Sequence, residues 1–458
     1  MSRIPGPNIF SGMFALRDIS KNPLKGMTDL VRNHGDLVRV RTGKKPILVV
    51  NDPTNAKNVL SDDSIYVRTN PPPLRKFLSG SLLLSRGEDW EQRKRSDGEA
   101  FTEIISEKAL KDLVESADYA IERFGSTEND GGRPEILEEF RKIMFRMTSE
   151  AFLRTRFTES ETETIINDIG RIEDITERWS TRLVKPSKRT LRQERKETHE
   201  IKKRHDSIIL PKVASRIHEV NKEDNLISIL QKKNKKDGNP LPPQDICGVL
   251  GNLIAGERAS SIVMTWILHC LSLNPRVQLE ARKEINRTTS GKPIEEKHLK
   301  DLEFLDHVVE ETLRLYPPTW KIFRATNQET RLQNHLVPPG TLIMISPYLL
   351  HRNPRYWSHP DDFYPERFSS QDARDTDSGA YMPFGFGPRA CLGKNMAFQQ
   401  LKIITSLVVQ KYDIKEESEE EIKPSPGFYL NPDSNPCISL EPVRTEKGDH
   451  IEHDGSVQ

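Results

Sequence analysis

One of the four cysteines, Cys391, lies in a glycine-rich run that could prepare its sulfur for chemistry. The run reads Phe384-Gly-Phe-Gly-Pro-Arg-Ala-Cys-Leu-Gly393, and apolar residues at helical spacing follow it directly. Backbone N–H groups at a helix start would converge on the cysteine and stabilise a thiolate. Side-chain bulk is absent at three glycines around it, so a flat macrocycle can approach the backbone: Gly385, Gly387 and Gly393.

Two further side chains of this run modify the environment of the sulfur. Phe384 can cover it from water, and Arg389 adds positive charge nearby. The pattern therefore predicts a stabilised thiolate at Cys391 rather than an inert apolar residue.

The remaining cysteines and the composition exclude several classes of protein. Cys247, Cys270 and Cys437 are widely spaced, so neither a disulfide framework nor a zinc ribbon is encoded, and a reducing compartment fits best. The 69 basic and 68 acidic residues nearly cancel, which gives no global field for nucleic acid. With 458 residues the chain can enclose a cofactor completely.

The N-terminus carries no recognisable targeting segment. It reads Met-Ser-Arg-Ile-Pro-Gly-Pro, and no window of the chain reaches the roughly 18 apolar residues of a spanning helix. We expect a soluble, cytoplasmic protein without a transmembrane anchor. A chain from which an N-terminal anchor had been removed would look the same.

The elements that must position Cys391 are mostly helical. Residues 36–43 and 46–50 predict a β-hairpin, and residues 89–236 have the three- and four-residue apolar spacing of helices. Residues 244–274 contain no proline and predict one long, largely buried helix. A strand is expected near residues 342–345, and a helical stripe resumes after Leu392.

We therefore predict a mainly α fold with small β-sheets, of the α+β class. No internal repeat or low-complexity linker divides the chain. Residues 1–442 should form one domain, followed by a disordered tail over residues 443–458.

The cysteine run resembles the haem-binding signature of the cytochrome P450 family, F-x-x-G-x-R-x-C-x-G. Phe384, Gly387, Arg389, Cys391 and Gly393 fill every fixed position. The resemblance extends over nearly the whole chain and is weakest between about residues 160 and 240. It implies a P450-like haem fold with a long central helix, in which Cys391 ligates the iron of haem b (iron protoporphyrin IX).

The resemblance also implies how the haem is held. In the family, its propionates are bound at positions that match Trp90, Lys94, Arg324 and Arg389. Most members carry arginine where this chain has Lys94. A lysine keeps the charge but loses the bidentate fork, so looser binding is expected there.

A charged cluster is expected to support the cysteine loop. Glu311 and Arg314, in the run Glu-Thr-Leu-Arg, resemble the family's E-x-x-R motif and share one helix face because they are three residues apart. Pro365-Glu-Arg-Phe368 resembles the family's P-E-R-F segment, whose arginine, here Arg367, joins that bridge. We assign all three to structure rather than catalysis.

The long helix departs from the family where its members relay protons with an acid followed by a threonine. The stretch here is Ala255-Gly-Glu-Arg-Ala-Ser-Ser261, so Arg258 and Ala259 occupy the relay positions. Glu257 and Ser260 lie one residue to either side, about 100° away around the helix. A helix bulge, the substrate, ordered water or peroxide could each replace the relay. Alternatively, Ser260 bonds the preceding helical carbonyl and Glu257 faces water or pairs with a neighbour.

The resulting interpretation is a haem-thiolate monooxygenase that inserts one oxygen atom from O2 into an apolar small molecule. Ala255, Gly256 and Ser260 are the candidates for its oxygen-binding pocket. The missing relay leaves a peroxide-driven or non-hydroxylating enzyme as an alternative. A haem or ligand carrier without catalysis is the third hypothesis.

Electrons must come from a separate protein, because the chain lacks a glycine-rich dinucleotide fingerprint after a strand. A ferredoxin or flavodoxin-type donor with its reductase is implied. Five basic residues could attract it or simply be solvated: Arg93, Lys94, Arg95, Lys394 and Lys402. We expect a monomer whose substrate pocket is formed by residues 71–84, 158–218 and 319–323.

Overall fold

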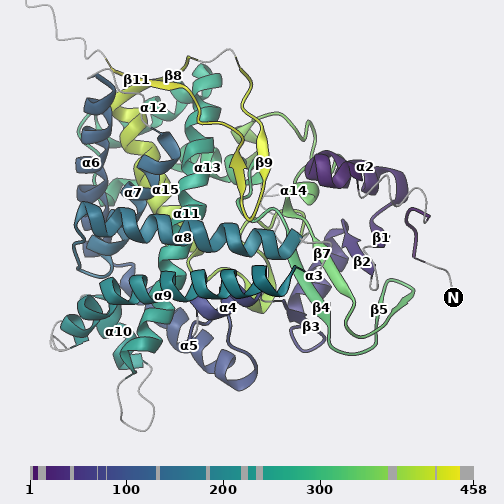
Figure 1. Ribbon diagram of the computed structural model, residues 1–458. Coiled ribbons are helices and arrows are strands. Elements are labelled where there is room, and N and C mark those ends of the chain that lie inside the picture. The colour runs from purple at the N-terminus through teal and green to yellow at the C-terminus, as the bar shows by residue number, and fades with distance from the viewer. Residues whose placement is uncertain are drawn as a thin grey trace, which may run out of the picture.

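The longest helix, α11 (Pro243–Leu273), runs through the helical body of the protein (Figure 1). It begins at a proline, whose fixed φ suits the first helical turn, and no further proline interrupts it before Pro275. Asn274 ends it by donating its side-chain amide to the Cys270 carbonyl over 2.7 Å. The long buried helix predicted for residues 244–274 is therefore confirmed.

The computed structural model describes residues 4–8, 17–41, 46–69, 71–78, 80–129, 135–181, 186–217, 225–233, 241–369, 379–417 and 420–443. The helices within these ranges, besides α11, are α2 (Pro23–His34), α3 (Pro53–Ser61), α4 (Pro72–Phe77), α5 (Gly87–Ile104), α6 (Glu107–Asn129), α7 (Ile136–Ala151), α8 (Glu159–Thr181), α9 (Lys188–Ile217), α10 (Leu226–Lys233), α12 (Pro275–Thr289), α13 (Glu303–Leu315), α14 (Pro347–Leu350) and α15 (Lys394–Lys411). The described ranges also contain short 3₁₀ helices at Glu296–Asp301, Pro365–Ser369 and Gly387–Arg389.

A five-stranded sheet lies beside the helical body, next to α2 and α3 (Figure 1). Its order is β1 (Leu37–Arg41), β2 (Pro46–Val50), β7 (Leu342–Ile345), β4 (Ile322–Thr326) and β3 (Tyr66–Arg68). Strands β1 and β2 form the predicted antiparallel hairpin, and β2 pairs with β7 in parallel. The β3–β4 pairing sets Arg68 directly opposite Arg324, although 256 positions separate them in the chain.

Three two-stranded sheets complete the β-structure among the described residues. They pair β5 (Thr330–Leu332) with β6 (His335–Val337), β8 (Tyr412–Glu416) with β11 (Ile438–Pro442), and β9 (Pro424–Pro426) with β10 (Leu430–Pro432). The turn between β9 and β10 carries Phe428 and Tyr429, which contact the main cavity. The predicted fold, mainly α with small sheets, is confirmed.

The core follows from the apolar faces of these helices. Trp266 of α11 is completely buried and stacks on Tyr316 at the end of α13, with ring centroids 3.9 Å apart. Such contacts fix α11 against the segment that precedes β4. None of the described helices combines the length and the apolar composition needed to cross a bilayer.

The predicted tail at residues 443–458 lies, after Val443, outside the described residues. Val443 itself donates its backbone N–H to the Lys411 carbonyl over 2.9 Å, which holds it against the end of α15.

Candidate functional site

The cysteine loop is closed by its own backbone. The N–H of Cys391 donates to the Phe384 carbonyl over 3.0 Å, and the N–H of Gly385 donates to the Met382 carbonyl over 3.0 Å. Gly387 has φ +72°, and a Cβ on it would lie 2.5 Å from the carbonyl oxygen of Leu60 in α3. Glycine is therefore required at position 387 by both the backbone conformation and the close approach of α3.

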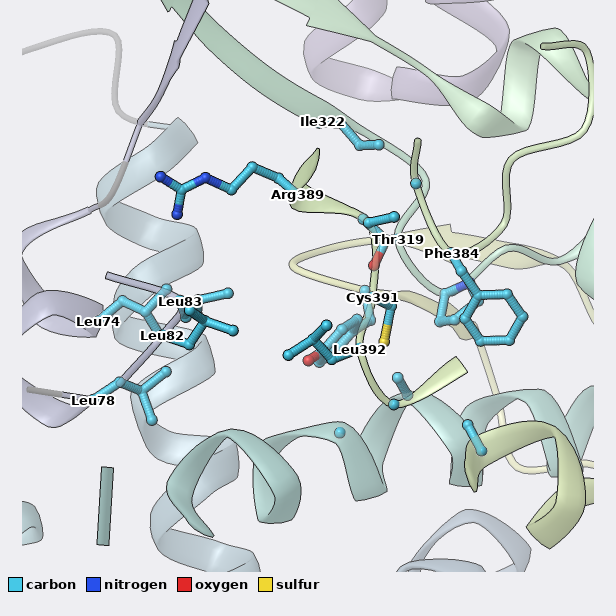
Figure 2. Close-up of a pocket in the computed structure, with 18 of the residues that line it drawn as sticks. Leu74, Leu78, Leu82, Leu83, Thr319, Ile322, Phe384, Arg389, Cys391 and Leu392 are labelled. Carbon is cyan, nitrogen blue, oxygen red and sulfur yellow. The ribbon is translucent and has the colours of Figure 1, made fainter. Parts of the chain in front are cut away.

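The Cys391 sulfur faces a cavity, and the Phe384 ring lies to one side of it (Figure 2). Burial raises the pKa of the Cys391 thiol, while a hydrogen bond from the Gly393 amide and the charge of Arg68 oppose this rise. The predicted stabilisation of the thiolate by the loop is thus present but outweighed by burial. A metal cation bound at the sulfur would reverse that balance.

The cavity in front of Cys391 has a volume of about 860 Å³, within the roughly 300–1,000 Å³ of typical ligand and cofactor sites. All three segments expected to form the substrate pocket contribute residues to its wall. One side of the cavity is strongly apolar and carries Leu74, Leu78, Leu82 and Leu83 (Figure 2). Two phenylalanines, Phe77 and Phe101, also line the cavity.

Three arginines gather at the cavity around one carboxylate, Asp63. Arg389 donates to Asp63 over 2.7 and 3.0 Å, and it donates to the Ser85 carbonyl over 3.0 Å. Burial, together with repulsion from Arg324 and Arg389, lowers the pKa of Arg68 to about 10. Burial likewise lowers the pKa of Arg324. This cluster has two positive charges more than Asp63 can balance, so it suits a ligand with two carboxylates.

The other residues predicted to hold such a ligand lie in the same place. The Arg389 guanidinium stacks on the Trp90 ring at 3.9 Å from its centroid, and the Lys94 ammonium lies 5.2 Å from the same ring. Trp90, Lys94, Arg324 and Arg389 all contact the cavity. Arg68 was missed by sequence reasoning, because only the register of β3 on β4 brings it opposite Arg324.

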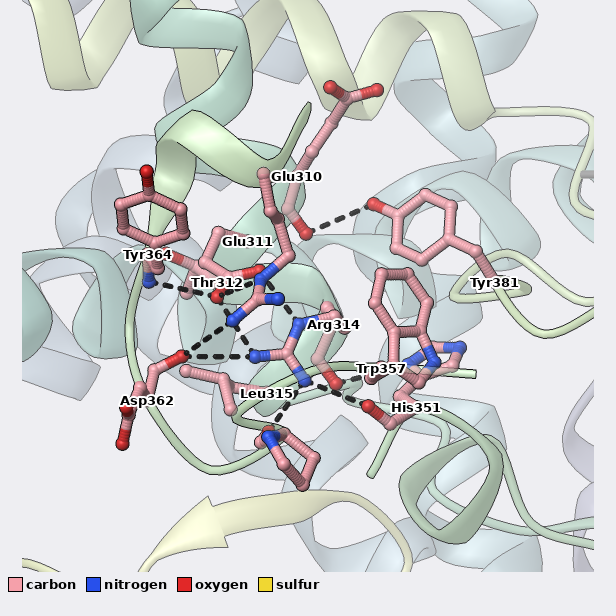
Figure 3. A network of polar contacts seen from close by, with 12 residues as sticks. Glu310, Glu311, Thr312, Arg314, Leu315, His351, Trp357, Asp362, Tyr364 and Tyr381 are labelled. Atoms are coloured by element: carbon pink, nitrogen blue, oxygen red, sulfur yellow. Dashed lines mark hydrogen bonds and ion pairs between the residues drawn. The ribbon is translucent and has the colours of Figure 1, made fainter. Parts of the chain in front are cut away.

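The predicted charged cluster is assembled, with Glu311 and Arg314 completely buried (Figure 3) and the Arg367 side chain 8% exposed. Arg314 holds Glu311 with two hydrogen bonds of 2.7 and 2.8 Å. Arg367 donates to the same carboxylate over 2.9 Å, as does the backbone N–H of Tyr364. Every carboxylate oxygen of Glu311 is therefore bonded, which offsets the desolvation cost of burying it.

A histidine connects this cluster with the cysteine loop. His351 Nδ1 lies 3.0 Å from the Arg314 carbonyl, and its Nε2 accepts the backbone N–H of Met382 over 2.9 Å. Burial lowers the pKa of His351 to about 3, so the ring is neutral and donates from Nδ1. Because Met382 also accepts from Gly385 at the start of the loop, the chain of contacts reaches the segment of Cys391.

A sequence model of the cytochrome P450 family matches residues 3–437. The chain belongs to the cytochrome P450 family. It is 26% identical to cyclooctat-9-en-7-ol 5-monooxygenase of Streptomyces melanosporofaciens, over 90% of this chain and 87% of that protein. It is 25% identical to cytochrome P450 3A41 of Mus musculus, over 96% of this chain and 91% of that protein. The chain is accordingly a haem-dependent oxidoreductase of the monooxygenase type.

Haem fits the residues of this P450. The sulfur of Cys391 is open to the cavity, and the excess charge of the arginine cluster matches the two propionates that haem carries. Gly393 leaves space beside the sulfur, since a Cβ there would lie 3.8 Å from Cys391 Sγ.

The structure bears on the alternatives left open for Ala255-Gly-Glu-Arg-Ala-Ser-Ser261 of α11. Gly256 and Ser260 contact the cavity, whereas the side chain of Ala255 lies outside the described residues. Of the two alternatives for Glu257, the structure shows pairing with a neighbour rather than exposure to water, because Glu257 is buried, contacts the cavity and lies 3.6 Å from Arg141 Nε. No bulge brings it inward, because α11 is α-helical throughout this stretch. Ser261, not Ser260, donates to the Glu257 carbonyl over 2.8 Å.

The five basic residues considered for partner docking are not equivalent in the structure. Lys402 is buried and lies 2.7 Å from Asp306, so it is not available at the surface. Arg93 lies 3.1 Å from Asp89 and donates to the Gly80 carbonyl over 2.7 Å. Exposed positive charge from this set therefore comes from Arg95 and Lys394.

Proposed function

We propose that this cytochrome P450 inserts one oxygen atom from O2 into a C–H bond of an apolar small organic molecule. The observation that carries the proposal is the Cys391 sulfur opening into a cavity with a strongly apolar wall and an arginine-rich rim. Haem b with a thiolate ligand supplies O–O bond cleavage and oxygen insertion when bound. The relative from Streptomyces is named as a monooxygenase of cyclooctat-9-en-7-ol.

Each group of residues has a role in this proposal. Cys391 ligates the iron, and the Gly393 N–H donates to its sulfur. Arg68, Arg324, Arg389, Trp90 and Lys94 hold the propionates, while the apolar wall binds the substrate and excludes water.

Glycine and small side chains on α11 leave room for oxygen beside the helix. Gly256 has nothing within 4 Å of the place where a Cβ would stand, and Ser260 follows one helical turn later on the cavity side. We assign the oxygen-binding pocket to this turn, together with Ala255.

The electrons come from a separate ferredoxin or flavodoxin-type donor with its reductase, and the P450 acts as a monomer. Arg95 and Lys394 supply exposed positive charge for docking an acidic donor.

A peroxide-driven reaction is the second candidate, and one observation favours it. Arg258 and Ala259 occupy the positions of the family's acid and threonine, so the usual relay from O2 is missing. Peroxide brings its own protons and electrons and would not need that relay.

One experiment separates these two reactions. A panel of fatty acids, terpenoids and steroids is screened for the largest shift in haem spin state, and that compound is then incubated with isotopically labelled O2 and a reductase chain or with peroxide. Labelled product with the reductase chain supports the monooxygenase. Product with peroxide alone overturns it in favour of the second candidate.

A further inference from the structure

Two buried carboxylates face the cavity on its oxygen-binding side. Glu257 of α11 and Glu173 of α8 are 3% and 8% exposed, and both contact the cavity. Neither carboxylate oxygen of Glu257 has a hydrogen-bond partner among the described residues. An ionised carboxylate buried in this way carries a large desolvation cost, so the neutral, proton-bearing form is favoured.

The charges around these two acids do not balance. Arg258 Nε lies 2.9 Å from Glu173 Oε2, and Arg141 Nε lies 3.6 Å from Glu257 Oε1. Glu138 of α7 is shared, since it lies 3.1 Å from Arg141 and 3.9 Å from Arg258. Three carboxylates thus surround two guanidiniums. Of the two buried acids, Glu257 lies farther from its guanidinium than Glu173 does, so Glu257 retains a proton unless it keeps a poorly paired buried negative charge.

The electrostatics of the cluster agree with this charge imbalance. Burial raises the pKa of Glu257 to about 8, with Arg141 opposing the rise and Glu173 adding to it. Burial raises the pKa of Glu173 to about 7, against the attraction of Arg258. Tyr429 also faces the cluster, and burial raises the pKa of its hydroxyl, so it stays neutral.

The cluster extends from the cavity to the surface. Glu257 is its innermost acid, with a fully buried side chain, and Arg141 joins it to Glu138, whose side chain is 37% exposed. Since an arginine keeps its proton, proton movement along this line needs the carboxylates and water rather than Arg141. Glu138 is the member that can exchange protons with solvent.

We propose that Glu257 holds the proton that this P450 delivers to the cavity, and that Glu138 and Arg141 connect it with solvent. The proposal rests on the monooxygenase function proposed above, and it assigns the missing relay to a side chain one position from the usual acid. Glu257 releases a proton to a water molecule in the cavity, becomes a carboxylate and regains a proton from solvent. The reaction consumes two such protons and two donor electrons, as one atom of O2 enters the substrate and the other leaves as water.

The primary test is an infrared pH titration of the haem-loaded, substrate-free enzyme. Wild type should show the C=O band of a protonated carboxyl group that disappears as pH rises through about 8. Glu257→Gln should lack this band, and Glu257→Asp should restore a titrating band. Glu284→Gln is the matched control, because Glu284 of α12 is also a buried glutamate but does not contact the cavity, and it accepts the backbone N–H groups of Phe304 and Leu305. Persistence of the band in Glu257→Gln would overturn the proposal.

The second readout is coupling, the fraction of consumed electrons recovered in product, with the panel compound that shifts the spin state of wild type most. Glu257→Gln should lower product formation by about 10²-fold, the lower range for loss of a general acid, while the spin-shift Kd stays unchanged. Glu257→Asp should recover part of the coupling, and Glu284→Gln should keep the wild-type coupling. A raised spin-shift Kd with unchanged coupling would mean that Glu257 anchors the substrate instead.

The two readouts keep this proposal separate from the proposed function. If wild type forms no product with the reductase chain, the monooxygenase fails, yet the infrared titration still tests whether Glu257 holds the proton. If wild type forms product and Glu257→Gln remains fully coupled, the proton assignment alone fails.

Discussion

The imidazole of His351 lies 3.0 Å from the carbonyl oxygen of Arg314, so a neutral histidine joins the buried charge cluster to the cysteine loop. Its second ring nitrogen accepts the N–H of Met382, which in turn accepts from Gly385. The ring can make both bonds only while it carries one proton. Protonation would place a positive charge against the buried guanidinium and break the contact with Met382.

Stability should therefore fall in acid through His351. Burial lowers the pKa of His351 from 6.5 to about 3. Between these pH values the histidine is protonated in the unfolded chain but neutral in the folded chain. The contribution is fully present above pH 6.5 and is lost as pH falls towards 3, amounting to a few kcal/mol at about 1.4 kcal/mol per pKa unit. Urea unfolding of wild type and His351→Gln at several pH values measures this slope. The slope should shrink in His351→Gln and persist in His199→Gln, a substitution at an exposed position of α9.

Removing the central carboxylate of the cluster should destabilise the protein strongly. Glu311→Ala leaves Arg314 buried without its partner and takes away the anchor of Arg367, so about 3–5 kcal/mol should be lost from the free energy of unfolding. Glu303→Ala, at a largely exposed position of the same helix, is the control and should change stability little. Equal losses in the two variants would contradict a supporting role for Glu311.

Features that depend on residues close together in the chain could be predicted from the sequence. The loop around Cys391, the proline-free run of α11 and the three-residue spacing of Glu311 and Arg314 each show their geometry in adjacent residues. Arg68 carries no such signal, because its place depends on the pairing of β3 with a strand more than 250 positions away. For Glu257 the sequence left open whether it faces water or pairs with a neighbour. Its neighbour Arg141 lies on α7, more than 100 positions away in the chain, so the helix angle alone could not identify it.

Loss of Arg68 should weaken retention of haem. A charge-assisted hydrogen bond contributes roughly 1.5–3 kcal/mol, so Arg68→Ala should speed haem transfer to a scavenger protein by about 10- to 100-fold. Arg68→Lys should transfer haem at a rate between those of wild type and Arg68→Ala, because lysine keeps the positive charge but lacks the bidentate guanidinium. Arg331→Ala on β5, at an exposed position, should transfer haem at the wild-type rate. A wild-type rate in Arg68→Ala would remove this residue from the propionate site.

The close approach of α3 to the loop can be separated from backbone strain by two glycine substitutions. Gly387 and Gly291 both have φ +72°, but a Cβ at Gly291 meets nothing within 4 Å, whereas one at Gly387 meets Leu60. Gly291→Ala should cost about 1–2 kcal/mol from the left-handed backbone alone. Gly387→Ala should lower the free energy of unfolding by clearly more than Gly291→Ala does, and it should also lower the haem content. Similar losses in thermal unfolding would show that the contact with Leu60 relaxes without consequence.

Thiolate ligation by Cys391 is tested most directly by the difference spectrum of the reduced enzyme with carbon monoxide. Wild type and Cys437→Ser, which alters a cysteine outside the cavity, should both give the long-wavelength Soret band of a thiolate-ligated haem. Cys391→Ser should lose that band while the protein stays folded. A Soret band at the position of a neutral axial ligand in wild type, or its persistence at long wavelength in Cys391→Ser, would contradict the assignment of Cys391 as the iron ligand.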